Sequence, residues 1–177
     1  MTPLATRLGA TRHTSVLLRR ARALGLADLS DLIRLAVQRG CDHYLGAAGK
    51  GEVADPGAEK LTDEELAILL LLGEHPFNPT ALRCAAQLLS GDEIDPDRVA
   101  RLARLERCER ALAHIARAGA AHDEHDSAFW QALLNRLPAR TPPADGALPH
   151  WTRFVSLTGV RRYFSPQMNS VWLRPRS

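Results

Sequence analysis

Residues 62–72, which read TDEELAILLLL, carry the clearest helix signal in the chain. Thr62 and Glu65 have the spacing of a capping box, in which the threonine hydroxyl and the glutamate carboxylate each accept a hydrogen bond from a free backbone N–H group. An apolar run from Leu66 to Leu72 follows directly. The sequence therefore predicts that a helix begins here and opens the helical core of the protein.

Three further helices are expected on the C-terminal side of this segment. The pairs at 78–79 and 95–96 each place an Asn or Asp cap before a proline at the first helical position, where the missing N–H group costs nothing. Asp126 and Ser127 open the last helix in the same region. The expected helices cover residues 79–90, 96–118 (closed by Gly119) and 127–137 (closed by Pro138).

Two shorter helices are expected on the N-terminal side, over residues 14–25 and 29–45. In the second, an apolar stripe at helical spacing lies on one face, with Asp28 as the cap and Gly40 as the residue that ends or loosens the helix. The stripe consists of Leu29, Leu32, Ile33, Ala36 and Val37.

Glycine- and proline-rich segments divide the chain. Residues 138–150 are rich in proline, and from residue 151 onward apolar β-branched and aromatic residues favour short strands or an irregular tail, among them Phe154, Val155, Val160, Tyr163, Phe164, Val171 and Trp172. We predict a mainly α-helical fold, either a helical bundle or a short helical-repeat array, with a small C-terminal β-hairpin or an irregular tail. The predicted units are an N-terminal helical module (1–45), a linker (46–61), a helical core (62–137), a proline-rich connector (138–150) and a basic aromatic tail (151–177).

The chain has 177 residues, of which 45% are apolar and 24% charged, and this composition excludes a fibrous or wholly disordered protein. The net charge of +3 hides an uneven distribution. Residues 1–45 hold seven arginines against three acids, residues 46–97 three bases against eleven acids, residues 98–125 six arginines against four acids, and residues 126–177 seven arginines against two acids. Both ends are therefore basic and the middle is acidic. Nearly all the positive charge is guanidinium, which suits bidentate contacts to phosphate or carboxylate.

Several classes of function are disfavoured by what the sequence lacks. It has no apolar stretch long enough for a membrane helix and no signal-peptide segment, so a cytoplasmic protein of bacterial type is expected. Cys41, Cys84 and Cys108 form no CxxC pair and are expected as reduced core thiols. The chain contains no GxSxG, GxGxxG or GK[ST] motif, which disfavours an enzyme, and no cofactor is expected.

The segment 17–39, LLRRARALGLADLSDLIRLAVQR, resembles the helical part of ribbon-helix-helix DNA-binding proteins. The resemblance implies a dimer in which residues 2–8 form a ribbon strand in the major groove, with Thr2, Thr6 and Arg7 as contacts to DNA. It also implies that Ser30 supplies a phosphate-holding turn at a helix start, with Arg34 beside it. The alternative is an ordinary helical hairpin.

The C-terminal segment from Trp151 contains five arginines, no acid and five of the nine aromatic residues of the chain. Single-stranded nucleic-acid binding combines phosphate neutralisation by basic residues with stacking of bases on aromatic rings. The candidate residues are Arg153, Arg161, Arg162, Tyr163, Trp172 and Arg174. The alternative is a tail whose aromatic residues dock on the helical core while its arginines stay solvated.

Residues 122–126, His-Asp-Glu-His-Asp, are all of metal-ligating type, and His122 and His125 are the candidate ligands of a divalent ion. A solvated loop is the favoured interpretation, because acidic caps are expected before the helix that begins at Asp126. Overall the sequence predicts a non-enzymatic, regulatory nucleic-acid-binding protein that uses its arginine-rich ends. The alternative is a helical adaptor or scaffold that binds an acidic protein partner.

Overall fold

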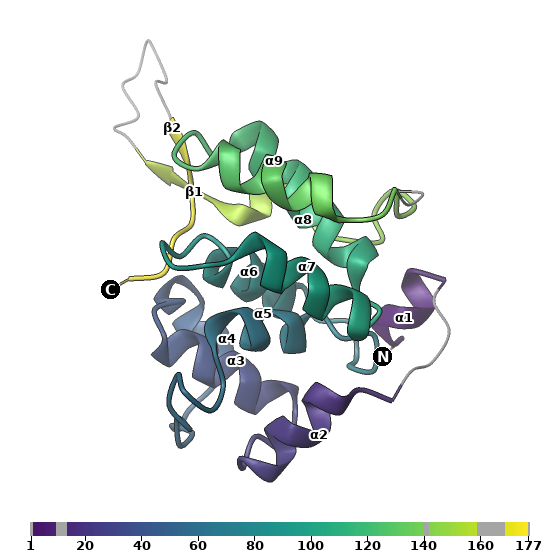
Figure 1. Ribbon diagram of the computed structural model, residues 1–177. Helices are drawn as coiled ribbons and strands as arrows, with labels where there is room; N and C mark the ends of the chain where they lie inside the picture. Colours follow the sequence, from purple (N-terminus) through teal and green to yellow (C-terminus); the bar gives the residue numbers. More distant parts are fainter. Residues whose placement is uncertain (1, 10–13, 140–141, 159–168, 177) are drawn as a thin grey trace.

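The computed structural model describes residues 2–9, 14–139, 142–158 and 169–176, and within these it is mainly helical with one small β-hairpin (Figure 1). The α-helices are α1 (Leu4–Arg7), α2 (Val16–Ala23), α3 (Leu29–Gln38), α4 (Leu45–Ala48), α5 (Asp63–Leu70), α6 (Pro79–Leu88), α7 (Pro96–Leu105), α8 (Glu109–His122) and α9 (Ser127–Arg136). Two 3-10 helices, η1 (Asp42–Tyr44) and η2 (Trp151–Phe154), and two strands, β1 (Val155–Thr158) and β2 (Asn169–Trp172), complete the described elements.

Helix α5 is the centre of the molecule. The Thr62–Glu65 capping box is present, and every residue of the helix after Asp63 is buried. A helix that is apolar on all sides needs neighbours on all sides, and α5 packs against α2, α3, α6 and α7. The segment with the strongest sequence signal is therefore the element around which the others assemble.

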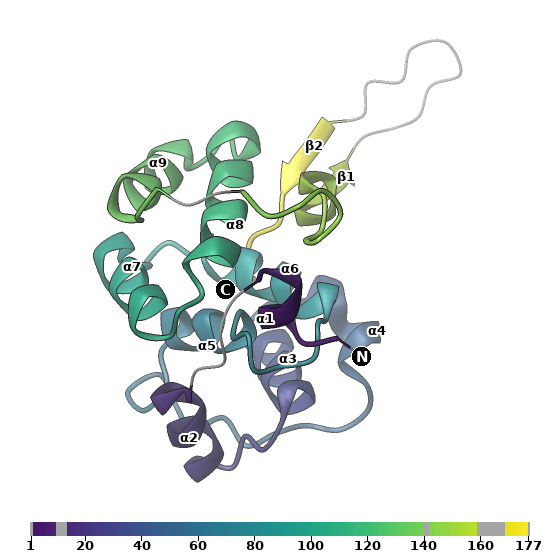
Figure 2. The same ribbon diagram turned by 90° about the vertical axis from the view of Figure 1, so that its right-hand side faces the viewer.

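The remaining helices lie on two sides of α5 and α6. Helices α2, α3 and α4 occupy one end, and α8 and α9 occupy the other, next to the hairpin (Figures 1 and 2). Helix α9 packs on both α8 and α7, which joins this upper layer to the middle of the molecule. One cluster of buried apolar side chains runs through these layers and extends on both sides of residues 62–137, from Leu4 to Trp172.

The helix starts marked by capping residues are confirmed. Asn78 and Asp95 each accept hydrogen bonds from backbone N–H groups and each precede a proline at the first position of α6 and α7. Asp126 caps α9, and Asp28 caps α3. Such starts are visible in a sequence because the cap satisfies N–H groups within two or three residues, without help from tertiary contacts.

The single helix predicted over residues 96–118 is wrong. Helix α7 ends at Leu105, α8 begins at Glu109, and Arg107 between them has a φ of 55°, in the left-handed region that stops a helix. The Glu106 carboxylate is buried in this turn and accepts a hydrogen bond from the Leu17 N–H at 3.0 Å. No glycine or proline marks the break in the sequence. The turn is stabilised by this contact between Glu106 and α2.

Gly119 does not close a helix but lies inside α8. The indole of Trp130 on α9 packs directly on it, and a side chain at this position would overlap the ring. The glycine therefore allows close approach of two helices. Further back, the helix expected to reach residue 45 ends at Gln38, and Gly40 follows with a φ of 100°.

Residues Leu4–Arg7 are helical, in place of the ribbon strand that the family resemblance implies. Leu4 and Leu8 are buried, and the Leu4 N–H donates to the His75 carbonyl at 3.1 Å. The segment is thus docked on the loop between α5 and α6.

The β-hairpin at the C-terminal end is present. Strands β1 and β2 are antiparallel, with Val155 opposite Trp172. Val160, Tyr163 and Phe164 lie outside the described residues. Cys41, Cys84 and Cys108 are free and buried, and within the described residues no helix is long and apolar enough to cross a membrane.

Candidate anion-binding site

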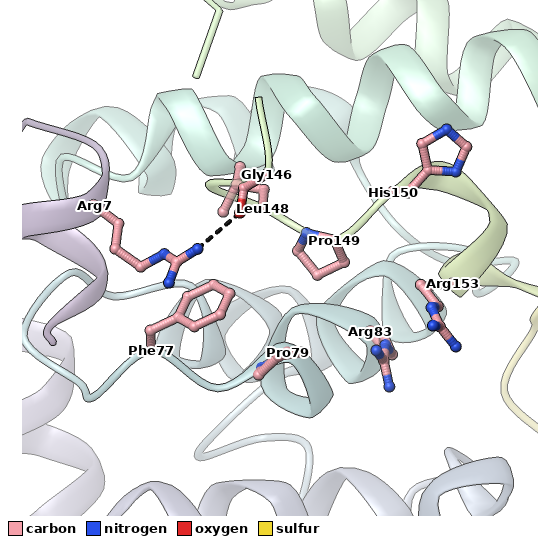
Figure 3. Close-up of a pocket in the computed structure, with 9 residues that line it drawn as sticks. All are labelled: Arg7, Phe77, Pro79, Arg83, Gly146, Leu148, Pro149, His150 and Arg153. Carbon is pink, nitrogen blue, oxygen red and sulfur yellow. Dashed lines mark hydrogen bonds between the residues drawn. The ribbon is translucent and has the colours of Figure 1, made fainter. Parts of the chain in front are cut away.

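A pocket of about 210 Å³ lies where α1, α6 and the segment before β1 meet (Figure 3). Three arginines and one histidine contribute its polar groups, and none of its lining residues is acidic. The lining residues are Arg7, Phe77, Pro79, Arg83, Gly146, Leu148, Pro149, His150 and Arg153. The pocket thus collects positive charge from the two basic ends of the chain and from α6.

Arg7 fastens the proline-rich connector to the N-terminal helix. Its Nε donates to the Ala147 carbonyl at 3.1 Å, and its Nη2 donates to the Gly146 carbonyl at 2.8 Å. The guanidinium carbon lies 4.0 Å above the centre of the Phe77 ring, which is a cation–π contact. These contacts build one wall of the pocket and leave Nη1 without a hydrogen bond to any described residue.

The opposite wall is held by hydrogen bonds to the backbone. His114 on α8 contacts the Pro149 carbonyl through Nε2 at 2.8 Å, and since a carbonyl only accepts, Nε2 carries the proton. Burial lowers the pKa of His114, which keeps the ring neutral. The Tyr44 hydroxyl donates to the Arg153 carbonyl at 3.3 Å. The rim is therefore positioned by helices on both sides.

Arg83 and Arg153 are the two arginines of the pocket that are not used to hold the fold. Neither forms an ion pair with a described carboxylate, and Figure 3 shows their guanidinium groups pointing the same way. The Nε of Arg83 is buried without a hydrogen-bond partner, whereas Arg153 is exposed.

The pocket can therefore bind an oxyanion. Guanidinium groups form charge-assisted, bidentate hydrogen bonds to phosphate and carboxylate. Phe77, Pro79, Leu148 and Pro149 supply the apolar part of the lining. Comparison with protein-family models, with curated proteins and with solved structures found no match to this chain.

The candidate residues from the N-terminal half are separated in space. Arg7 lines the pocket, while Thr6 is exposed on α1. Ser30 lies at the start of α3, where its N–H and that of Asp31 already donate to the Asp28 carboxylate. Arg34 pairs with Asp31. The start of α3 therefore presents carboxylates and satisfied N–H groups.

The candidate residues of the C-terminal segment divide into two groups. Arg153 lines the pocket, but Trp172 is 4% exposed and donates from Nε1 to the Ser90 hydroxyl at 2.7 Å, so its ring faces the core and offers no face to a base. Arg174 pairs with Asp92 at 3.0 Å. Arg161, Arg162 and Tyr163 lie outside the described residues.

The residues of the candidate metal cluster hold the turn between α8 and α9. His122 stacks on Trp151 with ring centres 3.7 Å apart. Asp123 is buried and accepts hydrogen bonds from the Trp130 indole at 2.8 Å and from the His125 N–H at 3.1 Å. Among the described residues no three potential metal ligands come together.

Sequence reasoning missed Arg83, Phe77 and His150. One signal could have drawn attention to Arg83, because it is the only arginine among the eleven acids of residues 46–97. A single arginine in an acidic block, on the helix that follows an Asn-Pro cap, is a position where a specific role can be suspected. Phe77 and His150 carry no such signal, since their place in the pocket depends on the docking of α1 and of the connector.

Proposed function

We propose that this chain is a non-enzymatic nucleic-acid-binding protein with a regulatory role, and that its phosphate contacts are made by Arg83 and Arg153. The observation that carries the proposal is the pocket without acids, in which these two guanidinium groups lack carboxylate partners among the described residues. Arginines that face no carboxylate are suited to neutralise phosphates, which dominate the affinity of nucleic-acid complexes.

Arg153 is followed in the sequence by further basic and aromatic residues. Arg153 lies in η2, directly before β1. The sequence between β1 and β2 also contains Arg161, Arg162 and Tyr163. Basic residues that neutralise phosphates and aromatic residues that stack on bases are the combination that binding of single-stranded nucleic acids uses.

The proposed surface is narrower than the two basic ends of the sequence. Arg7 and Arg153 both line the pocket, on opposite sides of it in Figure 3, but Arg19 and Arg34 lie on α2 and α3, and α2 is at the end of the molecule opposite the hairpin (Figures 1 and 2). The proposal therefore places the phosphate contacts at α6 and η2, and assigns no phosphate contact to the start of α3.

The test is a fluorescence anisotropy titration of the full chain with labelled single-stranded DNA, duplex DNA and RNA at about 50 mM and about 200 mM salt. The double variant Arg83→Gln/Arg153→Gln is expected to bind about tenfold more weakly at low salt and to lose about one to two units of salt-dependence slope. The matched control Arg19→Gln/Arg101→Gln removes the same charge from exposed positions on α2 and α7.

Equal losses in the two double variants would mean that only net charge matters, and would overturn the assignment to the pocket. Absence of binding at low salt would overturn the proposal as a whole. A labelled polyglutamate peptide serves as a further arm, because the same guanidinium groups can also donate hydrogen bonds to carboxylates. Binding of the peptide without binding of nucleic acid would support the alternative function, an adaptor for an acidic protein.

A further inference from the structure

The charge in the pocket exceeds what one internal phosphate of a nucleic acid carries. Arg83 and Arg153 place two guanidinium groups on one side of the pocket, Arg7 places a third on the opposite side (Figure 3), and no acid lines it. An internal phosphodiester has one negative charge, while a phosphate monoester carries about 1.5 to 2 negative charges at neutral pH. On charge alone, the pocket matches a monoester better than a diester.

The size of the pocket leads to the same class of ligand. Pockets for drug-sized ligands measure roughly 300–1,000 Å³, whereas this one measures about 210 Å³. A site of this volume suits a phosphate and a few neighbouring atoms. The end of a larger molecule and a small phosphorylated compound both present such a group.

The aromatic ring in the pocket already has one face occupied. Arg7 covers one face of Phe77 at 4.0 Å, and the Nε and Nη2 atoms of the same arginine are used by backbone carbonyls. The donors left for a ligand are Nη1 of Arg7, the terminal guanidinium nitrogens of Arg83 and the exposed Arg153. These are donors for phosphate oxygens, since they offer N–H groups and no acceptor.

We infer that the pocket binds the terminal phosphate of a nucleic-acid strand and thereby distinguishes phosphorylated strand ends from hydroxyl ends. The inference rests on the proposed function, because it names the part of the nucleic acid that the same site recognises. Phe77 acts here as a positioning residue that holds Arg7 in place, and Arg83 and Arg153 contact the phosphate.

The experiment compares three short single-stranded oligonucleotides of one sequence: with a 5′-phosphate, with a 3′-phosphate and with two hydroxyl ends. The full chain is titrated against each by anisotropy at low salt. One of the phosphorylated ends is expected to bind at least about tenfold more tightly than the hydroxyl-ended strand. Arg83→Gln/Arg153→Gln is expected to abolish this preference, and the control Arg19→Gln/Arg101→Gln to retain it.

Each outcome decides between the two proposals. Equal, salt-sensitive binding of all three oligonucleotides would overturn the inference and leave the proposed function standing. Saturation by inorganic phosphate or a nucleoside monophosphate, with no binding of any oligonucleotide, would overturn both and assign the pocket to a small phosphorylated ligand. If the double variant does not fold, as judged by circular dichroism, Arg153→Gln alone is used, because Arg153 is exposed.

Discussion

The arginines at the α3 end of the molecule and those at the pocket have the same chemistry but opposite surroundings. Arg39, with 10% of its side chain exposed, pairs with Asp55 and with Asp63 and also donates to the Leu61 carbonyl at 2.6 Å. Arg83 and Arg153 face no acid in their pocket. Burial of a charge is tolerated when partners replace water, so the comparison separates arginines that hold the fold from arginines left for a ligand.

The carboxylates that pair with arginines near α3 and α5, here called the paired region, show the same contrast with the pocket. Hydrogen bonds from Arg39 hold the pKa of Asp55 below its usual value. Burial alone would raise the pKa of Glu65, but hydrogen bonds from Arg20 and from the Thr62 N–H outweigh it and the pKa is lowered. Both acids therefore stay charged under mildly acidic conditions, and the paired region remains neutralised. The pocket has no such internal anion among its lining residues.

The largest expected effect concerns the cost of placing a proton, and with it a charge, on a buried side chain. His75 is buried, its Nε2 has no hydrogen-bond partner, and burial followed by the nearby charge of Arg22 lowers its pKa to about 4. The folded state therefore keeps the ring neutral while the unfolded chain, with a pKa near 6.5, takes up a proton. His75 stabilises the fold fully above pH 6.5, and as the pH falls from there to about 4, about 3 kcal/mol of this stability is lost.

Urea unfolding at several pH values between about 7 and 4 measures this effect. The variant His75→Asn removes the ionisable ring, so its free energy of unfolding is expected to change less over the same range. His114 and the acids with lowered pKa, among them Asp55 and Glu65, remain in both proteins and supply the residual slope. Identical pH dependence in the variant and the parent chain would contradict the prediction.

The next largest effect is expected when one arginine from each environment is replaced by methionine. Arg39→Met leaves Asp55 and Asp63 without their guanidinium and the Leu61 carbonyl without a donor. We expect a loss of about 2 kcal/mol in the free energy of unfolding, since the partners are partly exposed and regain some hydration. Arg83→Met is expected to change stability by less than about 0.5 kcal/mol, because no ion pair is broken.

Thermal and urea unfolding of the two methionine variants provide the measurement. A loss of stability in Arg83→Met as large as that in Arg39→Met would show that Arg83 holds the fold, and the distinction between the two environments would fail. Nucleic-acid affinity gives the reciprocal readout. Arg39→Met is expected to leave it unchanged, provided the variant is folded at the temperature of the titration.

Local signals in the sequence were sufficient for most helix starts but not for the pocket. The caps at Thr62, Asn78, Asp95 and Asp126 act within three residues and were predicted correctly. The break at Arg107 was missed, because it depends on a contact between Glu106 and α2. The fold class was predictable for the same reason as the caps, since helical periodicity and turn residues are local properties.

Charge counts along the chain identified where arginines are abundant, but not which of them are paired. The basic block 1–45 contains both Arg39 and Arg7. Arg39 is neutralised by Asp55 and Asp63, whereas Arg7 lines the pocket. Arg83 comes from the acidic block and nevertheless has no carboxylate partner among the described residues. Pairing depends on tertiary distance, and a sequence block does not contain that distance.

The smallest expected effect concerns an ion pair that, unlike those of Arg39, is largely exposed to solvent. Arg174 donates to Asp92 at 3.0 Å, but the Asp92 side chain is 88% exposed. In high-dielectric surroundings such a pair is worth little, and Asp92→Asn is expected to change the free energy of unfolding by less than about 0.5 kcal/mol. The variant also releases Arg174, which lies next to β2, from its only described carboxylate partner. Nucleic-acid affinity at low salt is therefore expected to stay equal or rise slightly, and a fall in affinity would show that Arg174 contributes to binding only when Asp92 positions it.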